Sequence, residues 1–242
     1  MSRLSVNVNK VATLRNSRGG NVPSVIEAVD VCLQAGVTSI TIHPRADERH
    51  ITRRDVQEIA QRLAPLRGSI EFNIEGDPRP DLVDMVCAVR PDQCTLVPVL
   101  PGEITSQAGW PADTPPDSLR AIIQRMQQAQ IRVSLFVDPV LEAVEWAAVL
   151  GGDRIELYTE PFARAFEQGR GEQSLAQYAQ AAERAHALGL GINAGHDLDL
   201  HNLPLFKTLP HLDEVSIGHA LIGRALFVGL DRVVREYLEA LA

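Results

Sequence analysis

Short apolar runs rich in Val and Ile recur along the chain, and longer segments with helical periodicity separate them. The runs cover residues 4–8, 37–42, 69–74, 94–97, 131–137, 154–158, 190–193 and 214–217. Runs of this length and composition are typical of buried strands. Between the runs, apolar residues such as Val25, Val29 and Cys32 recur every three or four positions. This spacing predicts a helix after each strand.

Eight such strand and helix units in 242 residues predict a (β/α)8 TIM barrel. We therefore expect an α/β protein with parallel strands and a single barrel domain over residues 1–242. A doubly wound sheet is the alternative. It usually has fewer strands, and no Gly-x-Gly-x-x-Gly motif follows the first run.

Three connections after strands are longer than a usual barrel loop, and they cover residues 9–23, 98–116 and 159–173. We expect them at the carboxyl ends of the strands, where barrel enzymes build their sites. Residues 101–110 form the best candidate for a lid, because Gly102 and Gly109 give backbone freedom around Thr105. The alternative is a fixed surface loop packed by Trp110.

Composition narrows the class of function. The formal net charge of −8 argues against binding to nucleic acid or to anionic membranes. The three cysteines form no Cys-x-x-Cys pair, so neither a disulfide framework nor a structural zinc site is expected. No apolar stretch is long enough to span a membrane, and the first residues lack the apolar core of a signal peptide. We expect a soluble cytoplasmic protein that acts on small molecules.

Polar side chains gather at the predicted strand ends. They are Asn7, Asn9, Lys10, His43, Arg45, His50, His196 and His219, with Glu71 and Glu156 inside strand runs. Histidine exchanges protons near neutral pH, and burial raises the pKa of a carboxyl group on an apolar strand, so the set predicts proton transfers. For both glutamates the alternative is a carboxylate locked to Arg or Lys inside the barrel. Metal binding is a further alternative, although no His-x-His or His-Glu-x-x-His spacing supports it.

Two segments are suited to bind anions. Gly218 ends the last predicted strand and a helix follows at once, so N–H groups at the start of this helix would face a bound phosphate. After the first strand, Arg15 and Arg18 could clamp a second anion, or could simply form a solvated basic turn. Two anion sites predict a substrate with two phosphates or two phosphorylated substrates.

Four groups of motifs are similar to those of a known enzyme family. They are Asn-Val-Asn-Lys-Val-Ala-Thr-Leu-Arg-Asn-Ser-Arg-Gly at 7–19, Thr-Ile-His-Pro-Arg at 41–45 with Arg-His-Ile-Thr at 49–52, Asn-Ala-Gly-His at 193–196, and Ile-Gly-His-Ala-Leu-Ile-Gly-Arg at 217–224. In this order they resemble the pyridoxine 5'-phosphate synthases of deoxyxylulose-dependent vitamin B6 biosynthesis. The resemblance implies a TIM barrel that condenses 1-deoxy-D-xylulose 5-phosphate with 3-amino-2-oxopropyl phosphate and releases phosphate and water. It also implies a homo-octamer and no metal or organic cofactor.

The resemblance further implies roles for individual residues. His43 and Glu71 match the general bases of the family, and His196 matches its proton donor. The positions that hold the deoxyxylulose phosphate are matched by Arg45, His50 and Thr105. Those around the aminoketone phosphate are matched by Asn7, Arg18, Gly218 and His219, and Arg18 is expected to reach the site of a neighbouring subunit. The remaining substrate-binding positions are Asn9, Lys10 and Asp197.

Two departures from the family pattern fall among these positions. Asn9 and Lys10 stand where many relatives carry Asp and His, and a lysine can still hold an anion. Asp197 stands where relatives often have Gly, and its carboxylate would repel a phosphate unless the side chain turns away.

Two other functions compete with this interpretation. Lys10 at a strand end could form an imine with a ketose phosphate, as in a Schiff-base aldolase. A phosphate-binding protein without activity is the second, but the chain retains all three candidates for proton transfer, His43, Glu71 and His196.

Overall fold

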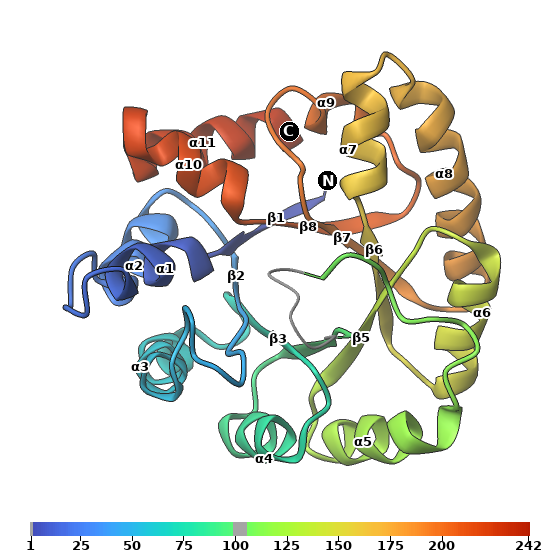
Figure 1. Ribbon diagram of the computed structural model, residues 1–242, viewed down its shortest axis with the longest axis horizontal. Helices are drawn as coiled ribbons and strands as arrows, with labels where there is room; N and C mark the ends of the chain where they lie inside the picture. The colour runs from blue at the N-terminus through green and yellow to red at the C-terminus, as the bar shows by residue number, and fades with distance from the viewer. Residues whose placement is uncertain (1, 99–105) are drawn as a thin grey trace.

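A closed ring of parallel strands forms the centre of the molecule (Figure 1). The computed structural model describes residues 2–98 and 106–242. The strands are β1 (Arg3–Asn7), β2 (Ser39–Ile42), β3 (Glu71–Gly76), β4 (Gln93–Leu96), β5 (Arg132–Val137), β6 (Arg154–Tyr158), β7 (Gly191–Gly195) and β8 (Leu212–Ile217). Each strand pairs with the next in the chain, and β8 pairs with β1 to close the ring. The predicted single-domain (β/α)8 barrel is confirmed.

Helices surround the barrel and cover its outer face (Figure 1). They are α1 (Asn9–Asn16), α2 (Val25–Gln34), α3 (Arg53–Leu63), the short 3-10 helix η1 (Ala64–Leu66), α4 (Pro80–Val89), α5 (Pro116–Gln128), α6 (Leu141–Leu150), α7 (Glu160–Glu167), α8 (Gly171–Ala187), α9 (Leu203–Phe206), α10 (His219–Val228) and α11 (Leu230–Leu241). Among the described residues, no helix combines the length and the apolar character that crossing a membrane requires.

Two of the three long connections contain helices that the sequence pattern did not predict. The connection 9–23 contains α1, and the connection 159–173 contains α7 and the start of α8. Helix α1 buries only Val11 and Ala12, so its apolar periodicity is weak. A helix that presents so small an apolar face is not recognised from hydrophobic spacing.

Strand residues alternate between an apolar outer face and a polar interior. In β1, Val6 belongs to the apolar core, whereas the hydroxyl of Ser5 lies 2.7 Å from the Oγ1 of Thr41 in β2. The Nδ2 of Asn73 donates to the Oγ1 of Thr41 at 3.3 Å, and the Oγ1 of Thr95 donates to Asn73 at 3.2 Å. The apolar core is therefore the layer between sheet and helices, and polar side chains, several of them hydrogen-bonded to one another, occupy the space inside the ring.

Glu71 begins β3 and so lies at the amino end of the barrel. Its carboxylate oxygens lie 2.8 Å from Arg3 and 2.6 Å from Arg132. Burial opposes its ionisation, yet the guanidinium groups of Arg132 and Arg3 hold the pKa of Glu71 below its usual range. Because His43 follows the carboxyl end of β2, the predicted grouping of Glu71 with His43 is wrong, and Glu71 is a carboxylate locked to arginine.

The connection between β4 and α5 contains the predicted lid. Its residues 99–105, with Gly102 and Thr105, lie outside the described residues. The N–H of Gly109 donates to the Oδ1 of Asp138 at 3.2 Å, and a Cβ on Gly109 would lie 2.3 Å from the Asp138 nitrogen. Gly109 therefore permits a close approach to the end of β5. The backbone freedom expected at this glycine is not its role.

Trp110 fastens the end of this connection to the barrel. Its backbone N–H donates to the carbonyl of Phe136, and its indole Nε1 donates to the carbonyl of Leu96, both at 2.8 Å. The indole ring also packs beside Trp146, with 6.2 Å between ring centroids. Trp110 thus packs against its own barrel, which is the contact expected in the alternative of a fixed loop.

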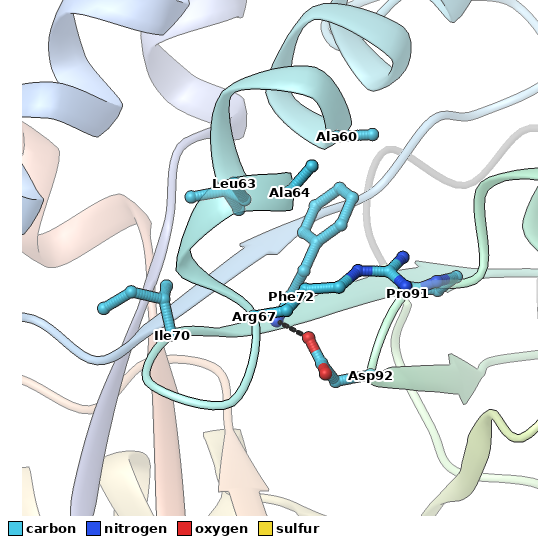
Figure 2. A pocket seen from close by; sticks show the side chains of 8 residues that line it. All are labelled: Ala60, Leu63, Ala64, Arg67, Ile70, Phe72, Pro91 and Asp92. Carbon is cyan, nitrogen blue, oxygen red and sulfur yellow. Dashed lines mark hydrogen bonds between the residues drawn. The ribbon is translucent and has the colours of Figure 1, made fainter.

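A small gap lies at the amino end of the barrel, between the end of α3 and the starts of β3 and β4 (Figure 2). It is lined by Ala60, Leu63, Ala64, Arg67, Ile70, Phe72, Pro91 and Asp92. The N–H of Phe72 donates to the Oδ2 of Asp92 at 2.9 Å, as the dashed line in Figure 2 shows. A volume of about 10 Å³ has room for about one water molecule, so we interpret the gap as a packing defect.

Replacing Glu71 by Gln tests the stabilising role of the ion pairs at the amino end. We expect Glu71→Gln to lower the free energy of unfolding at pH 7 by about 1–3 kcal/mol, less than for a fully buried pair, because water screens the half-exposed arginines. The pKa of Glu71 is lowered in the folded state, so its contribution is present above the ordinary pKa of glutamate and is lost as the pH falls below that. In urea titrations the parent and the variant should therefore converge in acid, and a constant difference would contradict this role.

Candidate active site

Three polar side chains meet at the carboxyl ends of β1, β2 and β3. Asn7 ends β1, His43 follows β2, and Glu75 lies one residue before the end of β3. The Nδ2 of Asn7 donates to the Oε2 of Glu75 at 3.4 Å. The Nδ1 of His43 lies 3.9 Å from the same oxygen, which is beyond hydrogen-bond distance but within an electrostatic contact. The carboxyl group that joins His43 at this rim is therefore that of Glu75.

Glu75 and His43 are both shifted towards their neutral forms. Burial raises the pKa of Glu75 well above its usual range, and the nearby Glu156 adds to the effect, while a hydrogen bond from Ser216 opposes it. Burial also lowers the pKa of His43 well below its usual range, and His50 and Arg45 contribute. Both shifts favour the neutral form of the group, which suits the pair for proton exchange.

His43 is held by its backbone, and one nitrogen of its ring lacks a hydrogen-bond partner among the described residues. Its N–H donates to the Oδ1 of Asn9 at 2.9 Å, and the N–H of Asn9 donates to the Oδ1 of Asn7 at 3.0 Å. The Nε2 of His43 is buried and has no hydrogen-bond partner in the described part of the chain. A buried ring nitrogen without a partner is suited to accept or donate a proton to a bound ligand.

His50 lies beside His43 in a region of positive charge. Their ring centroids are 6.0 Å apart. The N–H of Ile51 donates to the Nδ1 of His50 at 2.9 Å, so the hydrogen of the neutral ring is on Nε2. Burial, together with the charges of Arg45 and Lys10, lowers the pKa of His50 to about 4. A neutral N–H donor surrounded by cations suits an anion such as phosphate.

His196 follows β7 on the other side of the opening and packs on two aromatic rings. Its ring centroid is 5.7 Å from that of Phe136 and 5.4 Å from that of Tyr158. The φ of His196 is +83° and that of Asp197 is +36°, a left-handed pair of residues that is unusual outside glycine. The Oγ1 of Thr159 donates to the carbonyl of His196 at 2.6 Å. Strain of this kind persists where the surroundings hold it and is common at functional sites.

Asp197, one of the two departures from the pattern of the similar family, directs its side chain towards His196. Its carboxylate lies 3.7 Å from the Nδ1 of His196. The neighbouring imidazole of His196 lowers the pKa of Asp197, and the charge of His219 adds a smaller effect. The side chain is therefore ionised at neutral pH and directed at a histidine.

Glu156 lies within the barrel beneath this rim and is almost completely buried. Burial raises its pKa to about 8, and Glu214 contributes. Its Oε2 has no hydrogen-bond partner among the described residues, and Arg154 on the same strand bonds Asn193 and Asp213 instead. A Cβ on Gly195 would lie 2.3 Å from the Oε1 of Glu156, so this glycine leaves room for the carboxyl group. Glu156 is thus a neutral acid, and the alternative of a carboxylate locked to arginine does not fit it.

Of the remaining predicted residues, some lie beside the site and others do not. Gly218 immediately precedes α10, and His219 is the first residue of that helix. A Cβ on Gly218 would lie 3.1 Å from the Cβ of Asn7, so the start of α10 reaches the residue that contacts Glu75. Arg18 lies in the exposed turn after α1, and Thr105 lies outside the described residues. Arg15, predicted to clamp an anion with Arg18, instead forms two bonds to Asp55, at 2.5 and 2.8 Å.

Glu75 is the site residue that the sequence analysis missed. The predicted strand ended at residue 74, whereas β3 runs through Gly76. The alternation that places Glu71 and Asn73 inside the barrel continues to Glu75. Extending the alternation by one residue would have found it.

The described residues contain no cluster of three or more His, Cys, Asp or Glu side chains arranged to hold a metal ion. Lys10 is exposed on α1 and so lies outside the barrel interior. This arrangement directly supports proton exchange. The residues that would exchange protons lie between two regions suited to bind anions.

Known proteins resemble this chain over its whole length. Pyridoxine 5'-phosphate synthase of Bacteroides fragilis is 51% identical over 242 residues, which is 100% of both chains. The enzyme of the same name from Porphyromonas gingivalis is 49% identical over 243 residues, again with 100% of both chains covered.

Solved structures of low identity share the fold. Phosphoribosyl anthranilate isomerase from Thermus thermophilus has a TM-score of 0.61 at 12% identity and covers 99% of this chain and 98% of its own. 3-Keto-L-gulonate-6-phosphate decarboxylase from Vibrio cholerae has a TM-score of 0.65 at 11% identity, with 99% and 97% covered. At such identities the likeness shows the barrel alone. The sequence model described as "Pyridoxal phosphate biosynthesis protein PdxJ" matches residues 4–242, and together with the relatives at about half identity it shows that the chain belongs to the PdxJ family.

Proposed function

We propose that this chain condenses 1-deoxy-D-xylulose 5-phosphate with 3-amino-2-oxopropyl phosphate to pyridoxine 5'-phosphate, with release of phosphate and water. The relatives of about 50% identity are named for this activity. The observation that carries the proposal is the meeting of Asn7 and His43 at the buried carboxyl group of Glu75, whose pKa is raised, between two regions suited to bind phosphate.

In this proposal Glu75 and His43 exchange protons with the sugar substrate. Ring closure requires protons to be taken from carbon and given to leaving hydroxyl groups. The Nε2 of His43, which has no hydrogen-bond partner among the described residues, can accept a proton, and a protonated Glu75 can give one. Asn7 orients the carboxyl group of Glu75 through its Nδ2. Glu75 thus takes the role that the resemblance had assigned to Glu71.

His196 acts as the proton donor from the opposite side of the opening, and Glu156 supports the developing charge from below. The rings of Phe136 and Tyr158 hold the imidazole of His196 in place. Glu156 is buried and protonated at neutral pH, and its Oε2 has no hydrogen-bond partner among the described residues, so it can donate a hydrogen bond into the site.

The two phosphates occupy opposite sides of this centre. Arg45, Lys10 and the Nε2 of His50 take the deoxyxylulose phosphate, because they form the positive region beside His43. The start of α10, with Gly218 and His219, takes the aminoketone phosphate through backbone N–H groups. Asp197 is ionised and suits the ammonium group of the aminoketone better than its phosphate.

The Schiff-base aldolase has no observation in its favour. An imine-forming lysine needs a desolvated amine, and Lys10 is exposed on α1. Its charge instead acts on His50, which fits an anion contact.

We further propose a cytoplasmic homo-oligomer, an octamer, in which Arg18 enters the site of a neighbouring subunit. Support comes from Phe227 on α10, whose surface is 88% exposed, with Leu226 beside it. Helix α1 contacts α10 and carries the exposed Leu14, and Arg18 follows in the next turn. Exposed apolar residues on adjoining helices are typical of subunit contacts.

The two glutamates of β3 provide a matched test of the proton-transfer centre. We expect Glu75→Gln to lower kcat at least 100-fold, because an amide cannot transfer the proton, while Glu71→Gln stays within about threefold of the parent. To measure kcat, the formation of pyridoxine phosphate from both substrates is monitored by absorbance in a buffer that contains a chelator. Full turnover of Glu75→Gln would refute the assignment, and a need for added metal would refute the metal-free mechanism.

A side chain at Gly218 tests the site at the start of α10. We expect Gly218→Val to raise the KM for the aminoketone phosphate at least tenfold and to leave the KM for deoxyxylulose phosphate within about twofold, because the valine would occupy the approach to the N–H groups beside Asn7. Gly223→Val on the same helix is the control, since a Cβ there meets nothing within 4 Å. Equal kinetic constants for the two variants would rule out a phosphate at Gly218.

Mixing two inactive variants tests whether Arg18 serves a neighbouring subunit. Arg18→Ala and Glu75→Gln would each abolish turnover alone, but a mixed pair contains one site with both native residues. Co-expression with separate tags and isolation of the mixed oligomer should recover about one quarter of the parental activity if the subunits pair at random. A mixed oligomer without activity would place Arg18 in the site of its own subunit or in none.

A further inference from the structure

The loop from His43 to Thr52, between β2 and α3, carries the residues of the proposed deoxyxylulose phosphate site, and α1 runs beside it. One end of the loop is held by the first residue of α1, because the Oδ1 of Asn9 accepts the N–H of His43 at 2.9 Å. This contact fixes the backbone from which the His43 ring extends.

The other end of the loop is held by the last two residues of α1. The Nδ2 of Asn16 donates to the carbonyl of His50 at 2.8 Å, and a guanidinium nitrogen of Arg15 donates to the same carbonyl at 3.3 Å. Asn16 also reaches the carbonyl of Glu48 at 3.4 Å. One carbonyl oxygen with two side-chain donors from another helix is a firmly held point in a loop.

Arg15 is itself anchored on the start of α3. Its guanidinium bonds both carboxylate oxygens of Asp55, and the side chains of Arg15 and Asp55 are only 12% and 5% exposed. Asp55 also accepts the N–H of Thr52 at 2.7 Å, while Thr52 accepts the N–H of Asp55 at 3.2 Å. This reciprocal cap joins the first turn of α3 to the same network. The bidentate pair has a fixed geometry, which lysine could not reproduce.

The held carbonyl determines where the His50 ring points. The Nδ1 of His50 is occupied by the N–H of the next residue, Ile51, at 2.9 Å. The ring is thus tied to its own backbone, and its Nε2 donor moves whenever that backbone moves. A displacement of the carbonyl would therefore carry the donor away from a bound anion.

We propose that Arg15 and Asn16 are positioning residues that hold the Nε2 donor of His50 at the phosphate of the sugar substrate. Together with Asn9 they make α1 a brace that holds both histidines of the loop. This inference rests on the proposed function, in which His50 contacts the deoxyxylulose phosphate. Neither Arg15 nor Asn16 touches the substrate, and both act through His50.

Asn16→Ala tests the brace with little effect on folding, because Asn16 is only partly buried. We expect calorimetry to give a Kd for deoxyxylulose phosphate raised about fivefold, the size of one lost hydrogen bond. The KM for the aminoketone phosphate should stay within about twofold. The control is Ser17→Ala, since among the described residues the hydroxyl of Ser17 bonds only the carbonyl of Leu14 within the same turn, at 2.7 Å. An unchanged Kd for Asn16→Ala, or an equal rise for Ser17→Ala, would overturn the proposal.

A double-mutant cycle separates positioning from a general structural effect. In a His50→Ala background, Asn16→Ala should cause no further loss of affinity, because the donor that it positions is absent. Arg15→Lys, which keeps the charge but loses the forked contact, should behave in the same way. Losses that add to that of His50→Ala would overturn the proposal, as would a His50→Ala variant with parental affinity.

Measurements on the parent protein distinguish failure of the brace proposal from failure of the proposed function. A parent that binds deoxyxylulose phosphate and forms pyridoxine phosphate upholds the function whatever the variants do. A parent that neither binds nor turns over the substrates refutes the function, and the brace with it.

Discussion

Charge enclosed by the barrel has to be compensated, and the way this is done differs between its two ends. Because strand residues alternate, every second side chain enters the ring, and in this chain most of these side chains are polar. At the amino end, arginines compensate Glu71, which Arg3 and Arg132 bind. Arg3 also lies 3.3 Å from Glu214, but burial still raises the pKa of Glu214 to about 7. At the carboxyl end, Glu75 and Glu156 are shifted towards the protonated form, because burial without a cation disfavours the carboxylate.

Glu71 and Glu75 show this contrast on a single strand. They lie four residues apart on the same face of β3, and their pKa values are shifted in opposite directions. The first is a fixed negative charge between two guanidinium groups and stabilises the ring. The pKa of the second is raised, which favours its protonated form, and it lies beside a histidine whose pKa is lowered. The division places stability at one end of the barrel and proton chemistry at the other, as parallel barrels generally do.

Binding groups outside the ring need support of a different kind. His50 lies on a loop, and its position depends on side chains of α1 that bond the loop backbone. His196 follows β7 in a left-handed conformation, and the hydroxyl of Thr159 lies within hydrogen-bond distance of the carbonyls of Gly195 and His196. Loop residues of this kind keep a defined geometry only when neighbouring elements satisfy their backbone groups.

The sequence by itself determined the repeated strand and helix pattern, the barrel, and the strand-end positions of His43, His196 and Gly218. These follow from local periodicity, which a single chain displays without knowledge of its partners. The end of β3 was decided by tertiary pairing, because Glu75 lies opposite Thr95 and Gly76 opposite Leu96 in β4.

Only the tertiary structure decided the roles of Glu71, Glu75 and Arg15. Glutamate looks alike at both ends of β3, and the arginines that distinguish Glu71 come from β1 and β5, far away in the chain. Arg15 looked like an anion ligand until α3 brought Asp55 to it. The protonation and the partner of a buried charge depend on which charges the fold brings near, and that information lies in contacts between distant segments.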